Sequence, residues 1–93
     1  MPAKFTTHDV ETALGELPGW EGDETSLRRT FKFPDHITAV GFVVRLAMAA
    51  EVMDHHPDLR IVYNRVELTL SSHDAGGVTQ RDVDLAKKAS AFA

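Results

Sequence analysis

The stretch "DHITAVGFVVRLAMAAEVMDHHPDLRIVYNRVELTL", residues 35–70, decides the fold, because a strongly apolar segment ends within it and an alternating segment follows. Asp35 is a favoured N-cap that follows a proline, so we expect a helix to begin there. Pro57 forbids continuation of that helix, which should therefore run to about Asp54. Beyond Pro57, apolar and polar side chains alternate, as in a strand with one buried face.

The alternation is clearest in "RIVYNRVELTL", residues 60–70, where one set of side chains should face the core and the other the solvent. The predicted inward set is Val62, Val66, Leu68 and Leu70, and the outward set is Tyr63, Arg65, Glu67 and Thr69. Asn64 interrupts the inward positions. This indicates a break or bulge that divides the segment into two strands.

The helix predicted at residues 35–54 carries apolar side chains at nearly every angular position. A helix packed on one sheet needs an apolar stripe of only somewhat over about 100°. We therefore predict that another copy of the chain covers the rest, in a homo-oligomer built on this helix. The alternative is a helix buried centrally within the monomer.

The remaining segments complete the order of elements. Residues 6–17 predict a helix capped by Thr7, and residues 27–33 alternate like a strand that pairs with a short strand near Trp20. After the glycine loop at residues 73–77, Thr79 and Asp82 have the spacing of a capping box. The buried side of the helix that follows should consist of Val83, Leu85, Ala86, Ala89 and Phe92. The order predicts an α+β two-layer sandwich with an extra N-terminal helix, in a single domain covering residues 1–93.

Composition excludes several classes of protein. A net charge of −4 without a basic run argues against nucleic-acid binding, and the absence of cysteine excludes disulfides and cysteine-bound metal. The first residues lack the apolar core of a secretion signal. The most apolar segment, residues 39–53, is broken by Arg45 and Glu51 and looks too short for a membrane span. We expect a cytoplasmic protein.

Histidines are the candidate chemical groups, since imidazole exchanges protons in both directions near neutral pH. Glu51 and His55 are four residues apart and should share a helix face, whereas His56 points about 100° away. Both histidines should lie in the final helical turn, and His73 at the end of the next strand should return to the same end of the sheet.

Two other interpretations of these histidines stay open. They are typical of cations that cap a helix C-terminus. A zinc site from Glu51, His55 and His73 is conceivable, although the paired-histidine spacing of helical zinc sites is missing. His8 and His36, at helix starts, are expected to be solvated bystanders.

A longer pattern extends this set. Glu51 is followed after three residues by His55-His56-Pro57, after five more by Tyr63, after nine by His73 and after eight by Asp82. With "LPGW", "RTFKFPDHITAVGF", "VYNRV" and "TLSSHDAGGVTQRDVDLA" around it, the chain from about residue 14 to 86 resembles the pterin-4a-carbinolamine dehydratases.

The resemblance implies helices on one face of a four-stranded antiparallel sheet, and dimers or tetramers formed through the 35–54 helix and the sheet edges. It implies dehydration of 4a-hydroxytetrahydropterin to quinonoid dihydropterin in tetrahydrobiopterin recycling, with the pterin as partner and without metal or organic cofactor. His55 and His73 would then be the acid and base, and His56 an auxiliary or binding group. The orienting or substrate-binding residues would be Glu51, Asp54, Pro57, Ser71, Ser72, Arg81 and Asp82.

Within these roles, the resemblance suggests that Asp54 or Glu51 orients an imidazole. It also suggests that the backbone of Ser71 and Ser72 bonds to the pterin ring edge. The chain departs from many relatives at Leu59, where tryptophan is common, and at Ser72, where threonine is common. These departures bear on which pterin is bound.

Two other functions fit the same resemblance. Some relatives act as non-catalytic dimerisation cofactors for a transcription factor, and the apolar helix would suit that role. A pterin enzyme of another pathway, such as molybdopterin metabolism, is the second.

Overall fold

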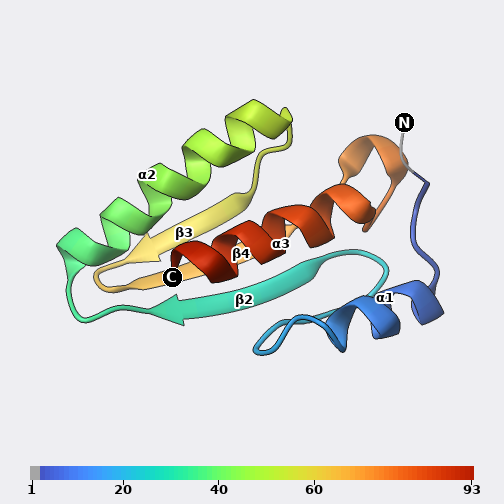
Figure 1. Ribbon diagram of the computed structural model, residues 1–93, viewed down its shortest axis with the longest axis horizontal. Coiled ribbons are helices and arrows are strands. Elements are labelled where there is room, and N and C mark those ends of the chain that lie inside the picture. The colour runs from blue at the N-terminus through green and yellow to red at the C-terminus, as the bar shows by residue number, and fades with distance from the viewer. Residues whose placement is uncertain (1–2) are drawn as a thin grey trace.

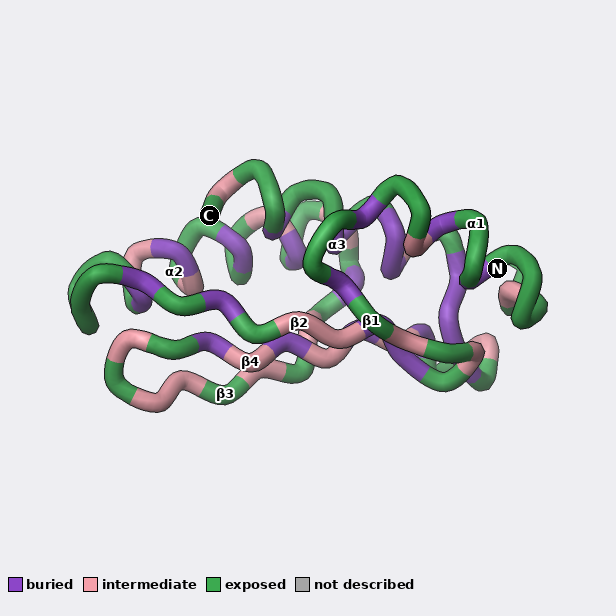
Figure 2. Tube along the Cα trace, turned by 90° about the horizontal axis from the view of Figure 1, so that it is seen from below, coloured by how far each residue is buried: buried purple, intermediate pink, exposed green. Residues whose placement is uncertain are grey.

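The computed structural model describes residues 3–93 and has a four-stranded antiparallel sheet with helices on one face (Figure 1). The elements in chain order are α1 (Thr7–Leu14), β1 (Glu21–Gly22), β2 (Leu27–Lys32), α2 (His36–Met53), β3 (Asp58–Val62), β4 (Arg65–Leu70), the 3-10 helix η1 (His73–Ala75) and α3 (Gln80–Phe92). The sheet order is β1-β2-β4-β3. In the edge-on view the helices form one layer and the strands the other (Figure 2), which confirms the predicted α+β sandwich.

Side-chain caps fix where the helices begin. Asp35 accepts the N–H of Thr38 at 2.7 Å, so α2 begins where predicted. The cap of α1 is Thr6 and not Thr7, so that prediction was wrong by one residue. Thr6 lies three residues before Asp9, and the two exchange hydrogen bonds at 3.1 and 2.9 Å in a capping box that Thr7 could not complete.

The 60–70 segment is a hairpin, as the break at Asn64 predicted. Its turn changes the face on which the first strand's residues lie. Ile61 pairs with Val66, while Val62 pairs with Arg65 and lies on the sheet face away from the helices. The prediction that Val62 points inward with Val66 was therefore wrong, because it treated the two strands as one continuous strand.

The core lies between the sheet and the inner faces of α2 and α3. From α2 it receives Ala39, Phe42, Leu46 and Ala50. The predicted inner side of α3 is buried except for Phe92 near the chain end, which is only half-buried. Apolar burial of this kind contributes about 25 cal/mol per Å² and is the main source of stability.

The outer face of α2 is left uncovered in the single chain. Ile37, Val40, Val44, Met48 and Val52 are exposed, so α2 is not buried centrally in the monomer. By length and composition alone, α2 would also be long enough and apolar enough to cross a membrane. The argument that the apolar segment is too short therefore fails, although the inner face of α2 is packed on the sheet.

Candidate active site

The end of α2 sets the positions of two histidines. Asp54 adopts the left-handed conformation (φ 52°), which ends the helix at Met53 and turns the chain. His55 and His56 therefore follow the helix. The prediction that they occupy its last turn was wrong. Glu51 and His55 consequently do not meet. Glu51 instead accepts a hydrogen bond from Nε2 of His56 at 2.7 Å, on the surface.

His55 points inward and contacts a carboxylate from α3. Its Nε2 donates to Oδ1 of Asp82 at 2.6 Å, in a pair whose side chains are 8% and 0% exposed. In residues 3–93 neither histidine forms a hydrogen bond with the side chain of Asp54. The carboxylate that fixes the inner imidazole is therefore Asp82, which lies 27 residues away along the chain.

Asp82 is held at the start of α3 by further donors. Its Oδ2 accepts the Thr79 N–H and the Ser72 hydroxyl, both at 2.9 Å. The predicted capping box of Thr79 and Asp82 is confirmed. The same carboxylate thus begins a helix and orients an imidazole.

His73 lies on a short loop and not at a strand end. β4 ends at Leu70, and His73 begins η1. The loop is closed by paired backbone hydrogen bonds between Ser72 and Gly77. Asp74 of this loop accepts a hydrogen bond from the Arg81 guanidinium at 2.6 Å, and this contact lowers the pKa of the Asp74 carboxyl.

These segments meet at an open pocket of about 400 Å³. Its lining residues are Asp54, His55, His56, Ser71, His73, Asp74 and Arg81. Six of the predicted site residues therefore share one surface. Ser72 and Asp82 lie beneath it, fully buried, whereas Glu51 and Pro57 do not line it. The Ser72 N–H and C=O both bond to Gly77. The expectation that the Ser72 backbone bonds to the pterin ring edge is therefore contradicted, because its backbone groups are already paired.

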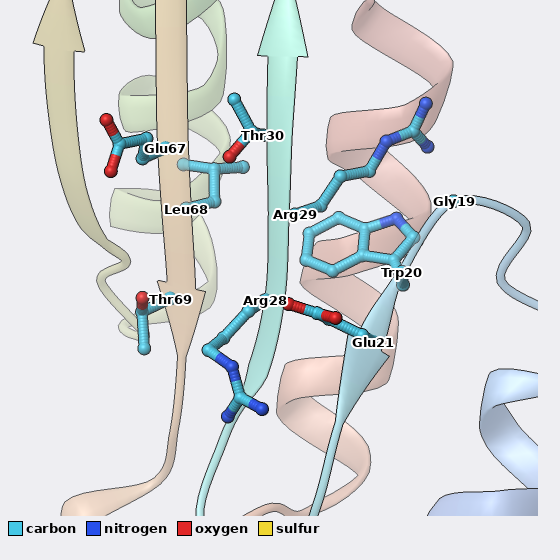
Figure 3. A pocket seen from close by; sticks show the side chains of 9 residues that line it. All are labelled: Gly19, Trp20, Glu21, Arg28, Arg29, Thr30, Glu67, Leu68 and Thr69. Atoms are coloured by element: carbon cyan, nitrogen blue, oxygen red, sulfur yellow. The ribbon is translucent and has the colours of Figure 1, made fainter.

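A larger pocket, of about 620 Å³, lies elsewhere, against β2, β4 and the chain around Trp20 (Figure 3). No histidine lines it, and three of its four charged side chains, those of Arg28, Arg29 and Glu67, already have partners. Arg29 donates to the Pro18 carbonyl at 3.0 Å, and Glu67 lies 3.5 Å from both Arg60 and Arg65. The smaller histidine pocket has the groups that exchange protons near neutral pH, so it is the candidate site.

Other histidine arrangements are not formed. Within residues 3–93, no group of three or more His, Asp and Glu side chains is placed to hold a metal ion, so Glu51, His55 and His73 do not converge as the zinc alternative requires. His36 is not a bystander, because its Nδ1 lies 2.7 Å from the Tyr63 carbonyl and joins α2 to the hairpin turn.

Comparison with known proteins gives consistent results. The profile of a family described as pterin 4 alpha carbinolamine dehydratase matches residues 3–92. A protein of Rhodopseudomonas palustris (strain BisB18), named for the same activity, is 50% identical over 95 residues, covering 100% of this chain and 94% of its own length. A similarly named protein of Sulfolobus acidocaldarius is 46% identical over 85 residues, covering 91% of this chain and 93% of its own.

Solved structures agree. The crystal structure of a transcriptional coactivator/pterin dehydratase from Brucella melitensis superposes with a TM-score of 0.94 at 40% identity, covering 97% of this chain and 98% of that one. A pterin dehydratase-like RuBisCO assembly factor of the alpha-carboxysome gives a TM-score of 0.64 at 22% identity, covering 78% and 84%. The second likeness shows the fold alone.

Proposed function

The chain belongs to the pterin-4a-carbinolamine dehydratase family, a family of hydro-lyases, and on that premise we propose that it converts 4a-hydroxytetrahydropterin to quinonoid dihydropterin in tetrahydrobiopterin recycling. The observation that supports this most is the pocket that His55 and His73 share, with one imidazole held by a buried carboxylate. Two proton-exchanging groups on one open surface are what this dehydration requires.

The reaction moves two protons. The C4a hydroxyl must receive a proton to leave as water, while the N5–H bond is broken and its electron pair forms the C4a=N5 bond. One of the two imidazoles delivers the first proton and the other accepts the second. Because Nε2 of His55 is occupied by Asp82, His55 exchanges its proton through Nδ1. Nδ1 has no hydrogen-bond partner among residues 3–93, and His55 lines the pocket, so Nδ1 is the ring nitrogen left for the substrate in this proposal.

Other residues of the pocket bind the pterin in this proposal. His56 and Arg81 line the wall beside the two imidazoles, and Ser71 lines it on the sheet side. Leu59 is half-buried, where many relatives carry tryptophan, so the chain should differ from them in affinity for the pterin side chain. Comparing turnover of pterins with and without the biopterin side chain tests this point and the alternative of another pterin pathway.

The direct test is stopped-flow dehydration of freshly generated 4a-hydroxytetrahydropterin. Wild type should accelerate the reaction, and His55→Ala and His73→Ala should each lower kcat by about 10²-fold or more, the size typical of general acid–base groups. His8→Ala, on the exposed surface of α1, is the matched control and should keep full activity. Undiminished turnover in both pocket variants would refute the assignment.

We also propose a homo-oligomer formed through the outer face of α2 and the sheet edges. The support is the exposed apolar row on α2, in which Met48 is 68% and Val52 is 89% exposed. Rows of this kind on soluble proteins mark interaction sites. Met48→Glu should shift the mass measured by light scattering towards the monomer, whereas Lys88→Glu, on exposed α3, should not. A wild type that is already monomeric at high concentration would refute the oligomer.

The same face supports a second candidate, a non-catalytic partner role, because the Brucella melitensis protein is described as a coactivator as well as a dehydratase. A folded, oligomeric wild type that does not accelerate dehydration would favour this role. The cytoplasmic location is likewise a proposal, to be tested by fractionating cells that express the protein.

A further inference from the structure

Two buried hydroxyl groups lie behind the proposed site, and the chemistry above does not use them. Ser72 is 1% exposed and Thr79 is 0% exposed. Their oxygens are 2.8 Å apart, and the Ser72 hydroxyl reaches Oδ2 of Asp82 at 2.9 Å. With His55 they form a continuous chain of hydrogen bonds, from the start of α3 to the pocket wall.

Counting protons fixes the direction of this chain. An ionised carboxylate only accepts hydrogen bonds, so Asp82 must receive the single hydroxyl proton of Ser72. Ser72 then has only lone pairs to offer Thr79, so the Thr79 hydroxyl donates to it. Thr79 in turn accepts the N–H of Arg81 at 3.2 Å. Every donor in the chain therefore points towards the carboxylate, which leaves Oδ1 to His55.

We infer that Ser72 is a positioning residue whose hydroxyl, oriented by Thr79, holds the Asp82 carboxylate in the rotation that keeps His55 with its proton on Nε2 and its Nδ1 lone pair towards the pocket. The effect of Ser72 on kcat rests on the proposed function. The fixed tautomer of His55 does not depend on that function.

Helix capping alone does not account for the arrangement. Thr79 and Asp82 complete the capping box with their own backbone groups, and Ser72 belongs to no helix. Ser72→Ala would therefore leave both bonds of the capping box intact. It would remove one of the two donors to Oδ2, together with the acceptor of the Thr79 hydroxyl. The Ser72 hydroxyl can thus be tested separately from the start of α3.

The test combines kinetics with the ring nitrogen spectrum of His55. In ¹⁵N-labelled wild type, correlation spectra across about pH 5 to 8, where imidazole titrates, should show the neutral ring of His55 as the Nε2–H tautomer. Ser72→Ala should give a mixture of tautomers and lower kcat by about tenfold, which corresponds to about 1.4 kcal/mol, with KM changed less than about twofold. Ser72→Thr, which keeps the hydroxyl, should restore both the spectrum and kcat.

Ser90→Ala is the matched control, because it removes a hydroxyl at the far end of α3 that accepts the Trp20 indole N–H at 2.9 Å. It should leave the His55 spectrum and kcat unchanged. If Ser72→Ala does not fold, Ser72→Cys replaces it, since a thiol keeps the volume but is a weak donor. A wild-type tautomer and kcat in folded Ser72→Ala or Ser72→Cys, which both lack the hydroxyl, would overturn the inference. If wild type has no dehydratase activity, the proposed function fails and the spectra alone decide the tautomer.

Discussion

Replacing Asp82 by asparagine would test the contact on which the candidate site depends. The change keeps the shape of the side chain and removes only its charge and one acceptor. In the native protein Oδ2 accepts two donors, Ser72 and the Thr79 N–H, while Oδ1 accepts one, His55 Nε2. The amide oxygen of asparagine satisfies two donors only if it takes the Oδ2 position. Its NH₂ group then faces His55.

The size of the effect follows from this geometry. An NH₂ group against Nε2 forces His55 to accept there, which moves its own proton to the other ring nitrogen, Nδ1. The lost hydrogen bond to a charged group corresponds to about 1.5–3 kcal/mol, or about 10- to 150-fold in rate. The wrong tautomer in a serine protease triad costs about 10⁴-fold, which sets the upper end. We therefore expect kcat of Asp82→Asn to fall between about tenfold and 10⁴-fold.

Single-turnover dehydration kinetics is the assay, because it separates the chemical step from product release. Asp84→Asn is the matched control, since Asp84 is exposed on the same helix and, among residues 3–93, its side chain accepts a hydrogen bond only from Gln80, at 2.9 Å. The helix content of both variants should match that of wild type, because the asparagine oxygen still accepts the Thr79 N–H. A folded Asp82→Asn variant with kcat within about twofold of wild type would refute the role of Asp82 in the chemistry.

Further predictions concern the loop that carries His73. Gly77→Ala should lower the free energy of unfolding by about 1–3 kcal/mol in urea titration, because the added Cβ would collide with the Glu24 carbonyl oxygen. Gly41→Ala is the control: it lies within α2 and faces only a flexible side chain, so it should be neutral or stabilising. Equal effects of the two substitutions would contradict this prediction. Asp74→Asn should be less stable than wild type at neutral pH. The hydrogen bond from Arg81 lowers the pKa of Asp74 below its ordinary value of 3.8. The ionised Asp74 therefore contributes its full stabilisation of the folded protein above pH 3.8, and this stabilisation is lost as the pH falls through the lower pKa of the folded state. The difference in thermal midpoint between wild type and Asp74→Asn should consequently vanish in strong acid. A difference that persists there would show that Asp74 acts by something other than its charge.

Features that depend on near neighbours were predictable from the sequence. Asp35 and the Thr79–Asp82 pair begin helices because a cap and its targets lie within three residues of each other. The alternation of Val66, Leu68 and Leu70 predicted a buried face, since side chains of a strand alternate with period 2.

Features that depend on backbone reversals or distant contacts were not predictable in the same way. Nothing in the local sequence pattern shows that the backbone of Asp54 is left-handed. Because of this conformation, Glu51 bonds to His56 and does not form the contact with His55 that was predicted. The bond between His55 and Asp82 joins residues from different elements, so only the fold brings them together. The role of Ser72 beneath the pocket was missed for the same reason.

The shared use of Asp82 by a capping box and by His55 has a consequence for local unfolding. Proteins open in small cooperative units, and a helix end that frays commonly does so without loss of activity. Here the first turn of α3 cannot fray without releasing His55, because the same carboxylate serves both. Hydrogen exchange at the Thr79 amide, which donates to that carboxylate, would therefore report the fraction of molecules that are ready for catalysis as well as the fraction with α3 intact.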